Sequence, residues 1–159
     1  MKKLLGIAAA LALLAPHAAS AQTFTTTPGT YTFSGNGVLV QKGSGPLLSC
    51  FLSIDVTNDG TSITAGNPVL TGSGGFCNTV VFQATPWPVT VSGTTVTISG
   101  IDVDTTITPG DCNGFLDATF STSGGTESLT VDTGFTTTST LPEVTASTGD
   151  CKIDGIISN

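Results

Sequence analysis

Asp102 and Asp104 are the residues whose type and spacing come closest to a catalytic pair. Residues two apart on a β-strand point to the same face, and paired carboxylates are the catalytic groups of most glycosidases. The same spacing is also common on any acidic protein surface, where both carboxylates are simply solvated. The pair therefore needs support from other catalytic groups before it indicates an enzyme.

Such groups are scarce, because the only histidine is His17 and the chain has no arginine. Histidine is the commonest general base and arginine the preferred phosphate clamp. A serine nucleophile would need a lysine as its base, and beyond residue 21 the only lysines are Lys42 and Lys152. No G-x-S-x-G or S-x-x-K motif lies near either lysine. We therefore expect no enzymatic activity, no catalytic residue and no cofactor.

Four cysteines, Cys50, Cys77, Cys112 and Cys151, form an even set. In an exported chain such a set predicts two disulfides. Zinc is the alternative, but the spacing contains no C-x-x-C pair. Four cysteines allow three connectivities, which the sequence leaves open, and the sequential pairing is favoured because each pair then brackets one block of strands.

Calcium is the one metal that the composition leaves open. Oxygen ligands occur at Asn58-Asp59-Gly60, at Asp102 to Asp104 and at Asp111. Asn, Asp and Gly are equally the residues of ordinary turns, and no EF-hand loop is present. We therefore assign no metal site.

The first 21 residues have the pattern of a secretory signal peptide. Lys2 and Lys3 precede an apolar run, Leu4 to Ala15, and small residues at Ala19-Ser20-Ala21 form a cleavage site. The run is shorter than the roughly 20 residues that span a bilayer. We expect residues 22–159 to form one secreted domain, extracellular or periplasmic, without a transmembrane segment.

The domain that remains is acidic and rich in threonine and glycine. The chain has eleven acidic residues and a formal net charge of −7. Nucleic acids and anionic membranes are unsuitable partners for such a surface. The charge instead favours solubility.

Alternation of apolar and polar residues predicts an all-β fold. Short strands are separated by turn residues at intervals of about ten, which is typical of an antiparallel β-sandwich or a partly closed barrel, and the sandwich is the favoured form. The residues predicted to face inward are Leu52, Ile54, Val56, Val89, Val91, Val96, Ile98, Leu116, Ala118, Phe120, Leu129 and Val131. The predicted turns are Asn58-Asp59-Gly60, Ser92-Gly93, Pro109-Gly110, Ser123-Gly124-Gly125 and Thr148-Gly149-Asp150.

The segment Pro86-Trp87-Pro88 fixes the direction of the only tryptophan. Its indole either caps the core or lies exposed as a hydrophobic contact, and burial is the favoured outcome. If exposed together with Phe76 and Phe82, it would form an apolar patch suited to lipids or hydrocarbons. The predicted partner is therefore a hydrophobic small molecule or a hydrocarbon surface.

An ordered set of short motifs resembles the protein activator of alkane oxidation family. The resemblance spans roughly Leu47 to Ile157 and implies a small secreted protein of Gram-negative bacteria, associated with growth on long-chain alkanes. It carries over no functional residue and implies a non-enzymatic helper that acts on hydrophobic substrate outside the cytoplasm. The motifs are Leu48-Ser49-Cys50, Cys77, Pro86-Trp87, Thr97-Ile98-Ser99-Gly100-Ile101, Cys112-Asn113-Gly114 and Cys151-Lys152-Ile153-Asp154-Gly155.

A structural subunit of an extracellular fibre or matrix is the alternative function. After cleavage, the segment from Thr23 to Phe33 lies at the new N-terminus, where a free strand could insert into the sheet of a neighbouring copy. Its apolar residues Phe24, Tyr31 and Phe33 are the candidate donor residues. This alternative predicts self-assembly.

Overall fold

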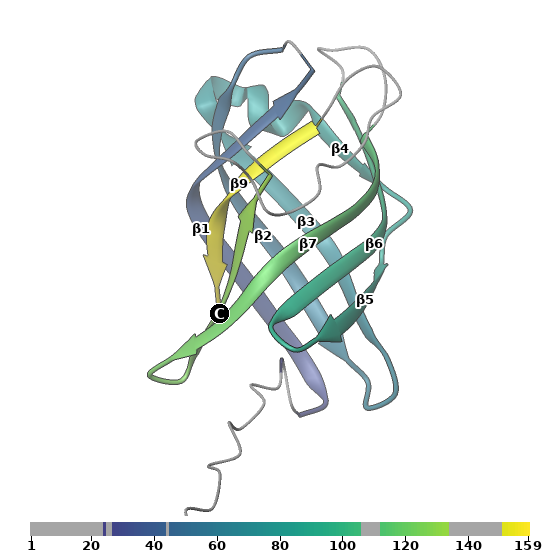
Figure 1. The fold of residues 1–159 in the computed structure, drawn as a ribbon. Coiled ribbons are helices and arrows are strands. Elements are labelled where there is room, and N and C mark those ends of the chain that lie inside the picture. Colours follow the sequence, from purple (N-terminus) through teal and green to yellow (C-terminus); the bar gives the residue numbers. More distant parts are fainter. Residues whose placement is uncertain (1–23, 25–26, 44, 106–111, 134–150) are drawn as a thin grey trace, which may run out of the picture.

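The described chain is nearly all β-strand (Figure 1). The structure, a computed structural model, describes Phe24 and residues 27–43, 45–105, 112–133 and 151–159. A short 3-10 helix, η1 (Ser73–Thr79), lies between the third and fourth strands. The strands are β1 (Gly29–Lys42), β2 (Leu48–Asn58), β3 (Ile63–Gly72), β4 (Val80–Gln83), β5 (Trp87–Ser92), β6 (Thr95–Thr105), β7 (Cys112–Ser123), β8 (Thr126–Asp132) and β9 (Cys151–Ser158).

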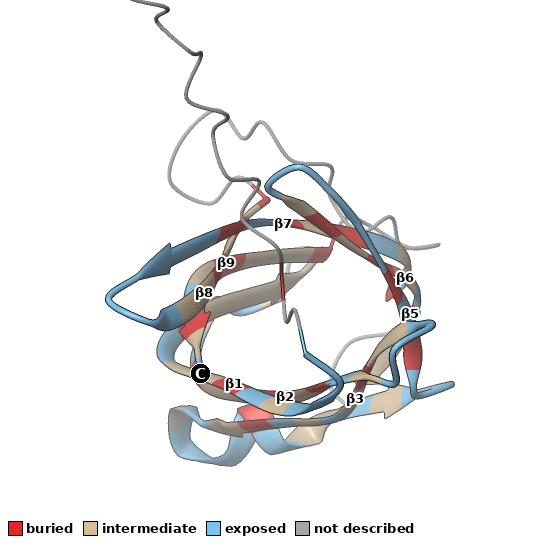
Figure 2. Cartoon of the chain, turned by 90° about the horizontal axis from the view of Figure 1, so that it is seen from below, coloured by how far each residue is buried: buried red, intermediate tan, exposed pale blue. Residues whose placement is uncertain are grey.

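Eight of these strands close into one antiparallel barrel. The hydrogen-bonded order is β6-β5-β3-β2-β1-β9-β8-β7, and β7 pairs back with β6. Strands that follow one another along the chain are thus neighbours in the wall, as in an up-and-down barrel. Figure 2 shows the ring end-on. The remaining strand, β4, pairs with the end of β6 that β5 leaves uncovered.

The all-β prediction is confirmed, and of the two predicted arrangements the structure has the barrel, fully closed. The apolar alternation along a strand is the same in a sandwich and in a barrel. The two architectures differ in which strands pair across the ends of the sheet. Here the pairings of β1 with β9 and of β6 with β7 close the ring.

Nearly all of the residues predicted to face inward are buried or line the interior. Val91 differs, because it is 38% exposed beside the β5–β6 turn, beyond the packed interior. The turns at Asn58, Ser92 and Ser123 are present. The other two predicted turns, the predicted signal peptide (residues 1–21) and Asp111 lie outside the described residues.

Glycines shape the wall at two points where a side chain would not fit. Gly100 has a φ of 70° and lies at a register shift in β6, so that Ile98 and Ile101, three residues apart, both face the interior. A Cβ at Gly35 would come within 2.2 Å of the carbonyl oxygen of Ile156 on β9. β1 and β9 can therefore approach this closely only because residue 35 has no side chain.

Aromatic rings fill one end of the barrel. The Phe24 ring centroid lies 5.6 Å from that of Phe33 and 5.1 Å from that of Phe120. All three side chains are at most 3% exposed. The cluster therefore closes the end at which the β5–β6 and β7–β8 turns lie.

Two disulfides staple the barrel, and both follow the favoured sequential pairing, Cys50 with Cys77 and Cys112 with Cys151. The first ties η1 to β2, and the second joins the first residues of β7 and β9. The β7–β8 register ends at Thr119 and Thr130, so the two strands are not hydrogen-bonded beyond that point. The second disulfide therefore links β7 to β9 where β8 no longer connects them.

Two carboxylates on the barrel are held by hydrogen bonds. Asp55 on β2 accepts hydrogen bonds from the Thr32 hydroxyl at 2.7 Å and from the Asn67 amide at 3.0 Å. These bonds, that from Thr32 most, lower the pKa of Asp55 below its ordinary value of 3.8. In the next turn, Asp59 accepts bonds from the backbone and hydroxyl groups of Ser62 and Thr61, which also lower its pKa.

We expect the barrel to lose stability as the pH falls below about 4. Both carboxylates have lower pKa values in the folded than in the unfolded chain, so the unfolded chain binds more protons in acid. The stabilisation is complete above the ordinary value of 3.8 and is lost as the pH falls through the folded-state values. Urea midpoints measured between pH 6 and pH 2 should fall less steeply for Asp55→Asn than for the parent, and equal slopes would contradict the assignment.

Candidate functional site: an apolar cavity inside the barrel

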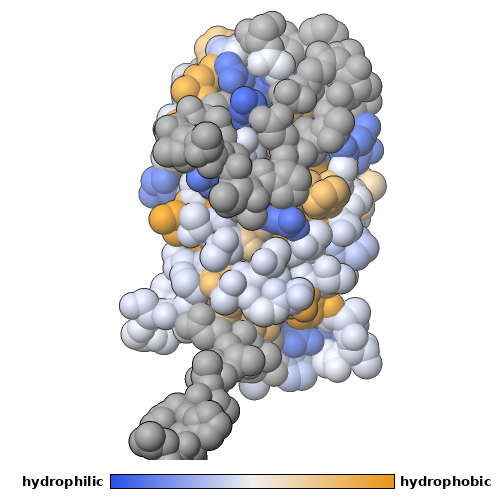
Figure 3. All heavy atoms as spheres, viewed as in Figure 1, coloured by the Kyte–Doolittle hydropathy of each residue, from blue (hydrophilic) through white to orange (hydrophobic). Residues whose placement is uncertain are grey.

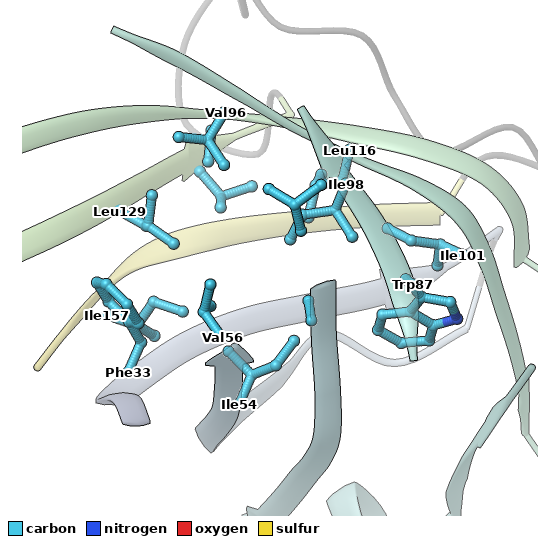
Figure 4. Close-up of a cluster of buried hydrophobic side chains, with 14 of the residues drawn as sticks. Phe33, Ile54, Val56, Trp87, Val96, Ile98, Ile101, Leu116, Leu129 and Ile157 are labelled. Carbon is cyan, nitrogen blue, oxygen red and sulfur yellow. The ribbon is translucent and has the colours of Figure 1, made fainter. Parts of the chain in front are cut away.

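An apolar cavity of about 160 Å³ lies inside the barrel and is partly open to its surroundings. Side chains from all eight wall strands line it, and β4 adds Val80 and Phe82. Figure 4 shows side chains from facing parts of the wall pointing toward one another in the interior. Among the lining residues are Ile54, Trp87, Ile98, Leu116, Leu129 and Ile157.

The cavity occupies the half of the barrel away from the aromatic end cluster. Phe33, Phe120 and Val96, which pack at the closed end, are absent from its lining, whereas the residues at the opposite end contribute to it. These are Lys42, at the end of β1, Cys112 and Cys151, at the start of β7 and β9, and Val103 near the end of β6. We call this second end the rim.

The size of the cavity limits what it can hold. An engineered protein cavity of about 150 Å³ lined by aliphatic and aromatic side chains stays dry and binds benzene. A volume of about 160 Å³ therefore accommodates roughly six carbon atoms. A short alkane, or one end of a longer chain, fits this space.

The predicted apolar contact residues separate into two places. Trp87 is 3% exposed, and its indole N–H donates to the carbonyl oxygen of Gln83 at 2.9 Å. The Phe82 ring packs edge-on against the indole, with the ring centroids 5.9 Å apart, and both residues line the cavity. Phe76, on η1, is instead 53% exposed. The three residues therefore form no common surface patch, and the favoured burial of Trp87 is confirmed.

The outer surface of the barrel offers little continuous apolar area on the face shown in Figure 3, where pale and hydrophilic residues surround small apolar spots. The exposed large apolar residues belong to different elements, for example Val69 on β3, Phe115 on β7 and Ile156 on β9. The interior offers a continuous apolar surface to which side chains of all eight wall strands contribute.

The predicted carboxylate pair does not face the cavity. Ile101 and Val103 line it, so Asp102 and Asp104 alternate away from the interior of β6. Asp104 lies at the rim, where its Oδ1 is 3.9 Å from the Lys42 Nζ. In the described part of the chain, no group of three or more His, Cys, Asp or Glu side chains is placed to hold a metal ion.

The candidate donor residues belong to the chain's own barrel. Phe33 lies in β1, which pairs with β2 on one side and with β9 on the other. Tyr31 is in the same strand and donates a hydrogen bond to the Thr27 carbonyl oxygen at 2.9 Å, while Phe24 packs in the closed end. Strand donation would therefore require β1 to leave both of its neighbours.

Lys42 is a cavity-lining residue that sequence reasoning did not place in the barrel interior. It follows Val38 and Val40 at intervals of two, so its side chain points into the barrel like theirs. Extending that alternation one step further along the strand would have placed a lysine inside an apolar wall. The sequence reading considered Lys42 only as the base of a serine nucleophile.

The fold and the cavity together define a small up-and-down barrel with an apolar interior, an architecture that elsewhere holds one small ligand. The chain also matches, over residues 1–159, the family described as alkane oxidation protein activator PraA/PraB-like. The chain belongs to this family, as the sequence motifs had predicted. No curated protein and no solved structure matches it. Among the helices of the described residues, none is long and apolar enough to cross a bilayer.

Proposed function

We propose that this protein is an exported, non-enzymatic helper of alkane oxidation that takes up one end of an alkane chain inside its barrel. The single observation that carries the proposal is the apolar cavity of about 160 Å³, in a chain that belongs to a family of alkane oxidation activators. The signal-peptide pattern of residues 1–21 supports action outside the cytoplasm.

The physical basis is the transfer of methylene groups out of water. Each buried CH₂ gains about 0.8 kcal/mol, so roughly six of them gain about 5 kcal/mol before the loss of translational freedom is subtracted. The resulting affinity is weak and the exchange is fast. Such a protein would raise the amount of alkane dispersed in water without holding it tightly.

Filling the cavity should abolish this uptake. Ala118 is 1% exposed and lines the cavity, and a cavity of this size can hold a benzene ring. We therefore expect Ala118→Phe to lower octane uptake at least tenfold. Uptake is measured by headspace partitioning of octane over the mature protein with both disulfides formed.

Thr119→Phe provides the matched control, because Thr119 is the exposed neighbour of Ala118 on the same strand. It adds the same ring to the outside of the barrel and should leave octane uptake unchanged. Equal uptake by the parent and Ala118→Phe, both folded, would show adsorption on the surface instead of in the cavity. Failure of the parent to take up octane would overturn the proposal itself.

A further inference from the structure

The positive charges of the domain are concentrated at the cavity, and the proposed function gives them no role. Beyond residue 21 the chain has only two lysines, Lys42 and Lys152, against eleven acidic residues. Both lysines line the cavity, and they are the charged residues of its described lining. In a chain with a formal net charge of −7, both lysines of this domain thus belong to the wall of one apolar site.

Lys42 is better placed than Lys152 to contact a ligand in the cavity. Its position continues the inward-facing series of Val38 and Val40, and its side chain is only 9% exposed. Its Nζ reaches to within 3.9 Å of the Asp104 carboxylate on β6. In the barrel order β1 and β6 stand on opposite sides of the ring, so the lysine side chain extends across the rim.

A lysine at this position adds nothing for a hydrocarbon. Taking an ammonium group partly out of water is unfavourable, and an alkane offers it no acceptor. A carboxylate at the end of an aliphatic chain does, because charge-assisted hydrogen bonds between ammonium and carboxylate are short and strong. An ammonium has three N–H donors, and a ligand carboxylate at the rim would accept from one of them beside or in exchange for the contacts that Lys42 already makes.

We propose that the cavity binds aliphatic carboxylates, with the hydrocarbon chain inside the barrel and the carboxylate at Lys42 on the rim. The proposal rests on the proposed function, because it uses the same cavity for the chain. It changes the preferred ligand from an alkane to an oxidised, anionic chain.

The test compares three eight-carbon ligands that differ only at one end: octanoate, 1-octanol and octane. Binding to the mature, disulfide-bonded protein is measured at pH 8 and low salt. We expect octanoate to bind about tenfold more tightly than octanol, which is the scale of one charge-assisted hydrogen bond. Lys42→Met, which replaces the ammonium by an unbranched apolar side chain, should remove this preference, so that octanoate binds no more tightly than octanol.

Two further variants separate the ammonium group from its other effects. Asp104→Asn breaks the same ion pair but keeps the lysine, so we expect the octanoate preference to persist or increase. Ser92→Glu, on the exposed end of β5 at the opposite end of the barrel, changes the net charge by the same amount as Lys42→Met and should leave the preference intact. Loss of the preference in Asp104→Asn to the same extent as in Lys42→Met would overturn the role given to Lys42.

The outcomes also distinguish the carboxylate site from the proposed uptake of alkane into the cavity. Equal binding of octanoate and octanol by the parent overturns the carboxylate site, while octane binding keeps the cavity function. No binding of any of the three ligands overturns the cavity function itself.

Anionic membrane lipid offers similar head-group chemistry, and cosedimentation with phosphatidylglycerol vesicles tests it. We expect no cosedimentation, because the eleven acidic residues outnumber the two lysines beyond residue 21 and the cavity is too small for two acyl chains. Cosedimentation that Lys42→Met abolishes would overturn the assignment to a free carboxylate.

Discussion

Phe33→Ala should lower the free energy of unfolding by about 3 to 5 kcal/mol, the usual loss when a fully buried phenylalanine is truncated. Phe33 has no exposed surface and packs against Phe24 in the closed end of the barrel. Its strand, β1, is hydrogen-bonded on both sides, so the vacated space cannot collapse easily. Urea denaturation of the oxidised protein measures the loss.

Phe76→Ala is the matched control for this prediction. It removes the same side chain from a position that is 53% exposed and should change the stability by less than about 0.5 kcal/mol. An equally small effect of Phe33→Ala would mean that β1 contributes little to its own barrel. That result would revive the fibre alternative, in which this segment is donated to a neighbouring copy.

Removal of the Cys112–Cys151 disulfide should also lower the free energy of unfolding by several kcal/mol. The disulfide closes a chain segment of 39 residues, and the chain-entropy account assigns about 4 kcal/mol to such a link. Both sulfur-bearing residues also line the cavity, at the point where β7 and β9 are no longer connected through β8. We therefore expect Cys112→Ser with Cys151→Ser to lower both the stability and the octane uptake.

The other disulfide, Cys50–Cys77, separates the effect on stability from the effect on uptake. Cys50–Cys77 closes a segment of 27 residues, so its removal should destabilise the barrel by a similar amount, about 3.5 kcal/mol. Its cysteines pack in a separate cluster with Leu70 and do not line the cavity. Octane uptake should therefore persist in Cys50→Ser with Cys77→Ser at temperatures where this variant remains folded. Equal loss of uptake in both double variants would show that uptake follows overall stability alone.

The strands that alternate strictly were predictable from the sequence. Ile54 and Val56 on β2, and Leu116, Ala118 and Phe120 on β7, follow the period of two and all are buried. The inward face of a half-buried strand depends mainly on this local pattern, so no long-range information was needed.

The closure of the barrel and the cavity depend on contacts that the local pattern does not contain. β9, from Cys151 to Ser158, pairs with β1 over more than a hundred residues of chain, and nothing in its own sequence specifies that partner. Register shifts at Gly35 and Gly100 bring residues three or more apart to the same face, which breaks the period of two. Lys42 was overlooked because a charged residue at the end of an apolar strand is usually on the surface.

The aromatic cluster at one end of the barrel determines how a ligand could enter and leave. Phe24, Phe33 and Phe120 fill that end, so under the proposed function a linear ligand would enter from the rim, one terminus first. Affinity for a homologous series should then rise with each added carbon until the pocket is full at about six carbons, and remain level for longer chains. The protein would thus bind the ends of hydrocarbon chains, and hydrocarbons longer than the pocket would bind with about the same affinity.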